Sequence, residues 1–250
     1  MKTFLALFLI IFFKQSFADG PGTIDRWVVW NIGQGQWATH ILTTTCIHYD
    51  VGGELGTFKR LRSSLLNFCG QKENRIVLSH WDYDHFLNLP YLARAVPHIC
   101  WETMPTFEIN KKTAQNIVAL KLPPCSTKFL EKIQITKWVP THGKTTNDSS
   151  IVHLEKKVLL PGDSTVRQEK EWATRMKDLN SVHVLVLGHH GSATSTSAQL
   201  LAHLPKLNFA IASARYVRYR HPNIKTIKRL ANAHVPVLRT EDWGSIWFEP

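Results

Sequence analysis

The chain has 250 residues, of which 44% are hydrophobic and 20% charged, so it can bury a substantial core within one α/β domain. Its formal net charge of +11 suits an anionic partner such as nucleic acid, although a basic surface also serves solubility alone. Internal repeats and low-complexity tracts are absent from the sequence, which excludes solenoid and fibrous proteins.

The first 18 residues are predicted to be a signal peptide. Lys2 precedes an apolar run of about ten residues, and Ser16-Phe17-Ala18 supplies small residues where cleavage requires them. The run is short for a bilayer span, although retention as an uncleaved anchor stays open. We therefore expect residues 19–250 to form a single domain in a periplasmic or secreted protein.

Short apolar runs recur along the chain and predict many strands separated by few helices. The predicted strands are residues 26–31, 41–45, 47–51, 75–79, 133–139, 151–154, 158–160, 182–187, 208–212, 235–238 and 245–248. The predicted helices are residues 57–68, 84–95, 166–177, 195–204 and 223–233. This pattern favours two packed sheets over one wound sheet. The polar residues 104–128 predict a long surface excursion beside a substrate groove.

Four cysteines, an even number, accompany the predicted export signal. Cys46, Cys69, Cys100 and Cys125 allow three disulfide pairings, and buried free thiols are the alternative. None of the four has the C-x-x-C spacing typical of thiolate zinc sites and thioredoxin-type motifs.

The segment Ser79-His80-Trp81-Asp82-Tyr83-Asp84-His85 is the strongest functional signal. It places four candidate metal ligands within six residues, in the pattern H-x-D-x-D-H, between a predicted strand and a predicted helix. On a tight loop, His80 with Asp82 and Asp84 with His85 can face two metal positions. Two metals about 3.5 to 4 Å apart can share a bridging hydroxide that attacks phosphorus or carbon.

Two further segments end predicted strands with candidate ligands. Asp163 follows residues 158–160 through a Pro-Gly turn, which is weak support alone because turns favour both Gly and Asp. His189 and His190 stand between two glycines after residues 182–187, which is more specific. The three segments together predict one metal site.

The ordered motifs of the chain resemble the metallo-β-lactamase fold, and within it the C-terminal nuclease domain of ComEC, the DNA-uptake protein of competent bacteria. The resemblance covers nearly the whole chain after residue 18. It begins at residues 30–35 (WNIGQG), and the six motifs that carry it are 49–53 (YDVGG), 79–85 (SHWDYDH), 147–152 (NDSSIV), 160–164 (LPGDS), 189–192 (HHGS) and 221–222 (HP). Asn31 and Gln36 stand where that family usually has acids.

The resemblance implies a four-layer αββα sandwich with the site on loops at one edge of the sheets. It implies a first metal position formed by His80, Asp82 and Asp163, and a second formed by Asp84, His85 and His189 with Asp163 bridging. A histidine more usual in this fold is replaced by Asp82, and residues 147–150 occupy the place of a later histidine motif. More carboxylates make the site harder, so we expect two divalent ions, manganese first, with zinc or magnesium as alternatives.

Other residues are candidates for supporting roles. Asp50 is expected to orient a ligand histidine, or to be a turn residue before two glycines. The candidate catalytic residues are Asp84, His190 and His221, although the two histidines can also serve as loop or capping residues. The candidate substrate-binding residues are Arg215, Arg218, Arg220 and Ser192. The arginines alternate with tyrosines, a pattern that suits phosphates and unpaired bases as well as a solvated basic surface.

These observations favour a metal-dependent nuclease or phosphodiesterase that acts on DNA through a metal-bridging hydroxide. A second hypothesis keeps the site but changes the substrate to a small lactone, lactam or phosphocholine ester, and predicts a small closed pocket. A third is a non-catalytic module that binds DNA or a surface.

Overall fold

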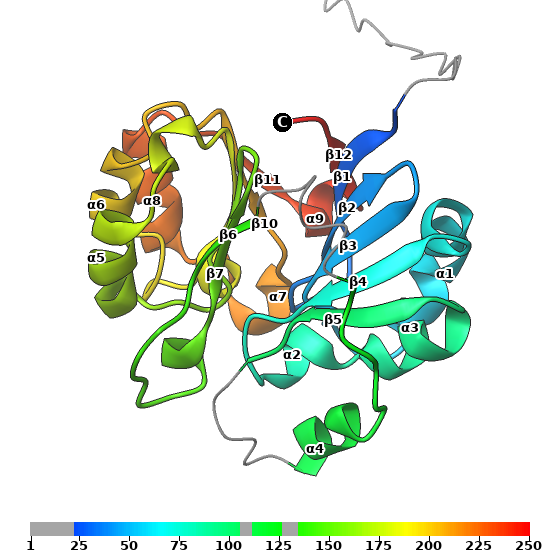
Figure 1. The fold of residues 1–250 in the computed structure, drawn as a ribbon. Coiled ribbons are helices and arrows are strands. Elements are labelled where there is room, and N and C mark those ends of the chain that lie inside the picture. Colours follow the sequence, from blue (N-terminus) through cyan, green and yellow to red (C-terminus); the bar gives the residue numbers. More distant parts are fainter. Residues whose placement is uncertain (1–22, 106–111, 127–134) are drawn as a thin grey trace, which may run out of the picture.

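In the computed structural model the described residues, 23–105, 112–126 and 135–250, form two six-stranded sheets packed face to face between helices (Figure 1). The predicted signal peptide lies outside the described residues. Within them, no helix is both long and apolar enough to cross a membrane.

The first sheet is mixed and has the spatial order β12-β1-β2-β3-β4-β5. Its strands are β1 (Asp25–Val29), β2 (Ala38–Leu42), β3 (Thr45–Tyr49), β4 (Glu73–Val77), β5 (Ile99–Thr103) and β12 (Ile246–Phe248). The strands β3, β4 and β5 are parallel, whereas β12, β1, β2 and β3 pair antiparallel. Residues 99–103 were not predicted as a strand, because Cys100, Glu102 and Thr103 interrupt the apolar pattern.

The second sheet has the order β11-β10-β9-β8-β7-β6. Its strands are β6 (Ile135–Trp138), β7 (Val152–Glu155), β8 (Val158–Leu160), β9 (Val184–Val186), β10 (Phe209–Ala212) and β11 (Val237–Arg239). The strands β8 to β11 are parallel, so their carboxyl ends lie at one edge of the sheet.

Helices cover the outer faces of both sheets, which gives four layers (Figure 1). The helices are α1 (Thr57–Cys69), α2 (Tyr83–Phe86), α3 (Leu89–Ala95), α4 (Lys112–Val118), α5 (Val166–Arg175), α6 (Ala198–Ala202), α7 (Tyr216–Tyr219), α8 (Ile224–Asn232) and α9 (Thr240–Trp243). The single helix predicted over residues 84–95 is two helices, because Pro90 lacks the N–H that a continuous helix would use.

Three apolar clusters fill the spaces between the layers. One, which includes Trp27 and Ile211, lies between the sheets. A second packs α1 and α3 on the first sheet, and a third packs α5, α6 and α8 on the second. The central strands of the sheets are therefore buried on both faces, whereas the edge strands β6, β11 and β12 are partly exposed. The expected αββα architecture is confirmed.

A buried polar group also joins the two sheets. The Glu155 carboxylate on β7 accepts a hydrogen bond from the Tyr49 hydroxyl on β3 at 2.5 Å, and lies 2.6 Å from Nδ1 of His40 on β2. Glu155 and His40 are fully buried. The contact crosses the apolar layer that otherwise separates the sheets.

Two disulfides resolve the cysteine pairing that the sequence left open. Cys46 on β3 pairs with Cys69 at the end of α1, and Cys100 on β5 pairs with Cys125. The first disulfide ties a helix to the sheet it covers, and the alternative of buried free thiols is wrong for these four residues.

Candidate metal centre

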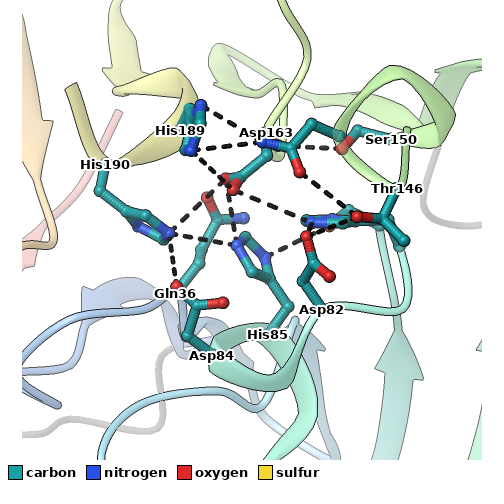
Figure 2. Close-up of polar contacts among 12 residues, drawn as sticks. Gln36, Asp82, Asp84, His85, Thr146, Ser150, Asp163, His189 and His190 are labelled. Carbon is teal, nitrogen blue, oxygen red and sulfur yellow. Dashed lines mark hydrogen bonds and ion pairs between the residues drawn. The ribbon is translucent and has the colours of Figure 1, made fainter. Parts of the chain in front are cut away.

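Strand ends from both sheets bring the predicted ligands together. The segment with His80, Asp82, Asp84 and His85 follows β4, while Asp163 follows β8 and the histidine pair follows β9. Because the carboxyl ends of these strands meet at one edge of the sandwich, side chains more than 100 positions apart in sequence face one another (Figure 2).

His80, Asp82 and Asp163 form one side of the centre. The His80 Nε2 atom lies 3.3 Å from Asp82 Oδ2 and 3.9 Å from Asp163 Oδ2. The Thr146 hydroxyl donates a hydrogen bond to Asp82 Oδ2 at 2.8 Å and so fixes this carboxylate. His80 and Asp163 are buried, while the Asp82 side chain is 18% exposed toward the cleft.

Asp84, His85 and His190 form the other side, with Asp163 between the two. The His190 Nε2 atom lies 3.1 Å from Asp84 Oδ2 and 3.3 Å from His85 Nε2. Asp163 Oδ1 is 3.1 Å from His85 Nε2 and 3.6 Å from His190 Nε2. Asp163 thus faces one group with each of its carboxylate oxygens, as a bridging ligand would.

The structure separates the two adjacent histidines. His190, not His189, stands with Asp84 and His85, where the resemblance had implied His189 (Figure 2). The His189 Nε2 atom is 3.6 Å from Asp163 Oδ2 and 3.2 Å from Asn147 Nδ2. Both histidines have positive φ, 47° and 55°, which turns the chain so sharply that neighbouring side chains reach different parts of the centre.

Asp50 holds the ligand loop from beneath. Its carboxylate lies 2.7 Å from His85 Nδ1 and accepts hydrogen bonds from the Ser79 backbone N–H, the Ser79 hydroxyl and the Gln36 amide at 2.8 to 2.9 Å. The contact to Nδ1 leaves Nε2 of His85 facing the centre. The backbone after Asp50 packs so closely on Asp84 that a Cβ at Gly52 would lie 1.6 Å from the Asp84 carbonyl oxygen.

The charges of the centre favour a cation at its middle. Burial alone would lower the pKa values of His85 and His190. The carboxylates of Asp163 and Asp50 outweigh burial at His85 and raise its pKa. The carboxylates of Asp163 and Asp84 do the same at His190. Burial alone would raise the pKa of Asp163, yet His85 and His190 hold that pKa well below its usual range. Bound metal ions can supply the positive charge that the protonated imidazoles otherwise provide.

The donor set fits divalent metal ions. Two groups, His80 with His85 and Asp163, and Asp84 with His85 and His190, each place their ligand atoms within 4.8 Å of one another. Among the described residues, the buried atoms His80 Nε2 and Asp163 Oδ1 make no hydrogen bond of normal geometry, although Asp82 Oδ2 lies 3.3 Å from the first and His85 Nε2 3.1 Å from the second. Buried polar atoms are almost always satisfied, so unsatisfied ligand atoms facing a shared centre match a metal site.

The centre forms the floor of a cleft of about 650 Å³. Its lining residues are Gln34, Gly53, Glu54, Leu55, Asp82, Tyr83, Asp84, Leu87, Asn147, Asp163, His189, His190, Arg218, Tyr219 and His221. His221 Nδ1 lies 3.4 Å from the Gln34 amide nitrogen. Burial, with the nearby His190, lowers the pKa of His221 to about 4, so this ring is neutral at pH 7.

The other predicted substrate residues differ in their relation to the cleft. Arg218 lines it, whereas Arg215 forms an ion pair with Glu54 at 2.9 Å. The Arg220 guanidinium lies 5.6 Å from the centre of the Tyr216 ring. The Ser192 hydroxyl contacts Thr194 at 3.0 Å, which supports the loop that carries the histidines.

Comparison with solved structures decides the fold. The chain superposes on a metallo hydrolase from Ignicoccus hospitalis KIN4/I with a TM-score of 0.56 at 12% identity, covering 90% of this chain and 99% of that one. A diphosphatase of the PhnP family gives 0.55 at 10% identity, covering 90% and 98%. The metallo-β-lactamase fold protein YhfI from Bacillus subtilis gives 0.53 at 10% identity, covering 91% and 100%. The chain has the metallo-β-lactamase fold.

The sequence is also similar to competence and recombination proteins, as expected. It is 25% identical to Recombination protein 2 of Haemophilus influenzae over 97% of this chain, and 25% identical to Competence protein ComA of Neisseria gonorrhoeae over 88%. It is 31% identical to ComE operon protein 3 of Bacillus subtilis over 36% of this chain. The chain spans 30%, 31% and 12% of these relatives' lengths, and no family model matches it.

Several residues at the candidate metal centre were not found from the sequence. Thr146 and Asn147 contact Asp82 and His189, and only the approximate place of residues 147–150 in the chain pointed to them. Gln36 was noted as a missing acid, but its amide holds Asp50. Apart from the motif at residues 147–152, no sequence signal distinguished these neutral side chains from ordinary loop residues.

Proposed function

We propose that the protein is a metal-dependent phosphodiesterase that cleaves DNA. The observation that carries this proposal is the Asp163 carboxylate, which faces two groups of ligands at the floor of a cleft lined by Arg218 and His221. The basic net charge and the similarity to proteins named for competence and recombination support DNA as the substrate.

Each of the two sides of the centre would hold one divalent ion. His80, Asp82 and Asp163 would hold the first, and Asp84, His85 and His190 the second, with Asp163 shared between them. Three carboxylates among six ligands favour manganese, with magnesium and zinc as alternatives. This assignment replaces His189 with His190 because His190 Nε2 lies 3.1 Å from Asp84.

The remaining cleft residues position the substrate. When bound, the ions supply an activated water and neutralise the charge that develops on the phosphate. Arg218 can pair with a neighbouring phosphate through its forked N–H groups. His221 is neutral at pH 7, so it contributes a hydrogen bond and not a positive charge, and the His189 ring 5.8 Å away lines the same side of the cleft.

A small phosphodiester is the second candidate substrate. Among the described residues Arg218 is the one lysine or arginine that lines the cleft, and the cleft volume matches that of sites for small ligands. A long groove lined by several basic residues would favour duplex DNA over a small phosphodiester.

The decisive experiment incubates residues 19–250 with plasmid and single-stranded DNA in manganese, magnesium, zinc or chelator. The His80→Ala, Asp84→Ala double variant is the matched control, because it removes one ligand from each group. We expect cleavage by the wild type in manganese, and none in chelator or with the variant. Cleavage that persists in either control contradicts the two-metal site, whereas hydrolysis of small phosphodiesters alone selects the second candidate.

We also propose that the protein acts in the periplasm or outside the cell. The two disulfides support this location, because such bonds persist in oxidising compartments. Fractionation of cells that produce the full chain tests it, and recovery of the protein with reduced cysteines in the cytoplasm would contradict it.

A further inference from the structure

Two exposed tyrosine rings stand at the cleft and have no role in the metal centre. Tyr83 is 43% exposed and Tyr219 is 39% exposed, and both line the cleft. Tyr83 begins α2, which follows strand β4 of the first sheet, and Tyr219 ends α7, which follows strand β10 of the second. The two helices lie at the same edge of the sandwich (Figure 1), so aromatic rings reach the cleft from both halves of the molecule.

The surroundings of the rings suit a flat, uncharged group beside a phosphate. The Arg218 guanidinium lies 5.2 Å from the centre of the Tyr219 ring and provides a cation next to it. Phe86 meets Tyr83 edge-on at 6.0 Å and supports that ring from inside the fold. Leu55, 72% exposed, adds an apolar contact on the lining. Nucleobases stack on aromatic faces of this kind irrespective of their sequence.

The depth of the centre restricts the form of the polynucleotide. His80 and His85 are fully buried and Asp163 is 3% exposed, so the reacting phosphate must enter the cleft. The cleft of about 650 Å³ falls within the usual range for a small ligand. A strand with unpaired bases can bend into it and present a base face, whereas a duplex keeps its base faces within the stack.

We propose that Tyr83 and Tyr219 form a subsite for an unpaired nucleobase next to the scissile phosphate, so that the protein acts on single-stranded or locally opened DNA. This inference rests on the proposed nuclease function and specifies its substrate. The tyrosines bind the base, while the ligand groups remain responsible for the chemistry.

The test compares three substrates of equal length: a thymidine strand, a strand of abasic sugar-phosphate units with the same charge, and a duplex. The variants are Tyr83→Ala and Tyr219→Ala, with Tyr83→Phe and Tyr219→Phe to retain the ring. Tyr91→Ala is the matched control, because Tyr91 is 44% exposed but lies outside the cleft lining. Bound manganese is counted for each variant to show that the centre is intact.

We expect the wild type to cleave the thymidine strand with a kcat/KM about tenfold above that for the abasic strand or the duplex. Each alanine variant should lose about fivefold to tenfold on thymidine and keep its activity on the abasic strand, whereas the phenylalanine and Tyr91 variants should match the wild type. Equal cleavage of the thymidine and abasic strands by the wild type, or equal losses on both by the variants, overturns the subsite.

A binding measurement separates this inference from the nuclease proposal. Fluorescence anisotropy in chelator reports the affinity of the metal-free protein for the labelled thymidine and abasic strands. Tighter binding of thymidine that disappears in the alanine variants supports the subsite even if no strand is cut, in which case the nuclease proposal alone fails. Equal affinity for the two strands, or no binding of either, overturns the subsite.

Discussion

Asp50 is the residue on which the geometry of the centre depends most. It is buried, and four contacts from Gln36, Ser79 and His85 converge on its carboxylate. Replacing it by asparagine keeps the shape but removes the charge that orients the His85 ring. We expect Asp50→Asn to weaken manganese binding by about 10- to 100-fold, measured by calorimetry. Asp178→Asn, at an exposed residue with positive φ, is the control, and equal affinity of the two variants would show that Asp50 does not orient the ligand.

The sequence could predict most of the candidate ligand residues but not all of their positions. The H-x-D-x-D-H pattern, Asp163 and the histidine pair all lie at the centre, because strand ends at one sheet edge bring them there. The choice between His189 and His190 as the neighbour of Asp84 depends on the positive φ of both residues. Histidine rarely adopts this conformation, so the sequence does not predict it.

At the scale of elements, Glu155 links β7 to β2 and β3 across the space between the sheets. Its removal would leave His40 and Tyr49 buried with an acceptor missing. We predict that Glu155→Ala lowers the free energy of unfolding by about 3 to 5 kcal/mol, measured by urea denaturation. Glu171→Ala, which breaks a surface pair with Arg175, should cost less than about 0.5 kcal/mol, and similar losses for both variants would contradict a buried link.

The strand β7 also contains a histidine that makes the fold sensitive to acid. Burial lowers the pKa of His153 from 6.5 to about 4, so the unfolded chain binds a proton in this interval that the folded protein does not. The contribution of the neutral His153 to the free energy of unfolding is therefore complete above pH 6.5. This contribution is lost as the pH falls toward 4, which lowers the free energy of unfolding by about 3 kcal/mol.

His153→Phe tests this contribution. Nε2 of His153 has no hydrogen-bond partner among the described residues, so phenylalanine loses no hydrogen bond there. Between pH 7 and pH 4.5, we expect the free energy of unfolding of the variant to fall by about 2 to 3 kcal/mol less than that of the wild type. Parallel pH profiles of the two proteins would contradict the assigned pKa.

Some boundaries of helices and strands could be predicted from the sequence, and others could not. The strand predicted at residues 158–160 matches β8, because a short apolar run between turn residues has few alternatives. The helix predicted over residues 223–233 matches α8, which begins at Ile224 after Asn223, whose side chain caps the helix by accepting the Lys225 N–H. The short helices α7 and α9 carry no apolar periodicity, so their sequences did not predict them.

At the scale of the whole molecule, the centre joins the two halves of the sandwich. His80 and Asp84 follow strand β4 of the first sheet, whereas Asp163 and His190 follow strands β8 and β9 of the second, so bound ions would connect the halves. We predict that manganese at about 100 times its Kd stabilises the folded state by about 2.7 kcal/mol and raises the Tm by about 5 to 10 °C. The His80→Ala, Asp84→Ala double variant should show no shift in calorimetry, and an equal shift in the variant would place the bound metal elsewhere.

We propose that Asp163 is shared by two metal positions that act together on a phosphodiester. The most direct measurement counts bound manganese and DNA cleavage in the same samples of the wild type and Asp163→Ala. We predict two ions per wild-type chain, and in the variant the loss of at least one ion together with a fall in cleavage of more than 100-fold, on the order of the effect of removing a key catalytic group. A variant that keeps both ions, or that cuts DNA at the wild-type rate, would contradict the claim.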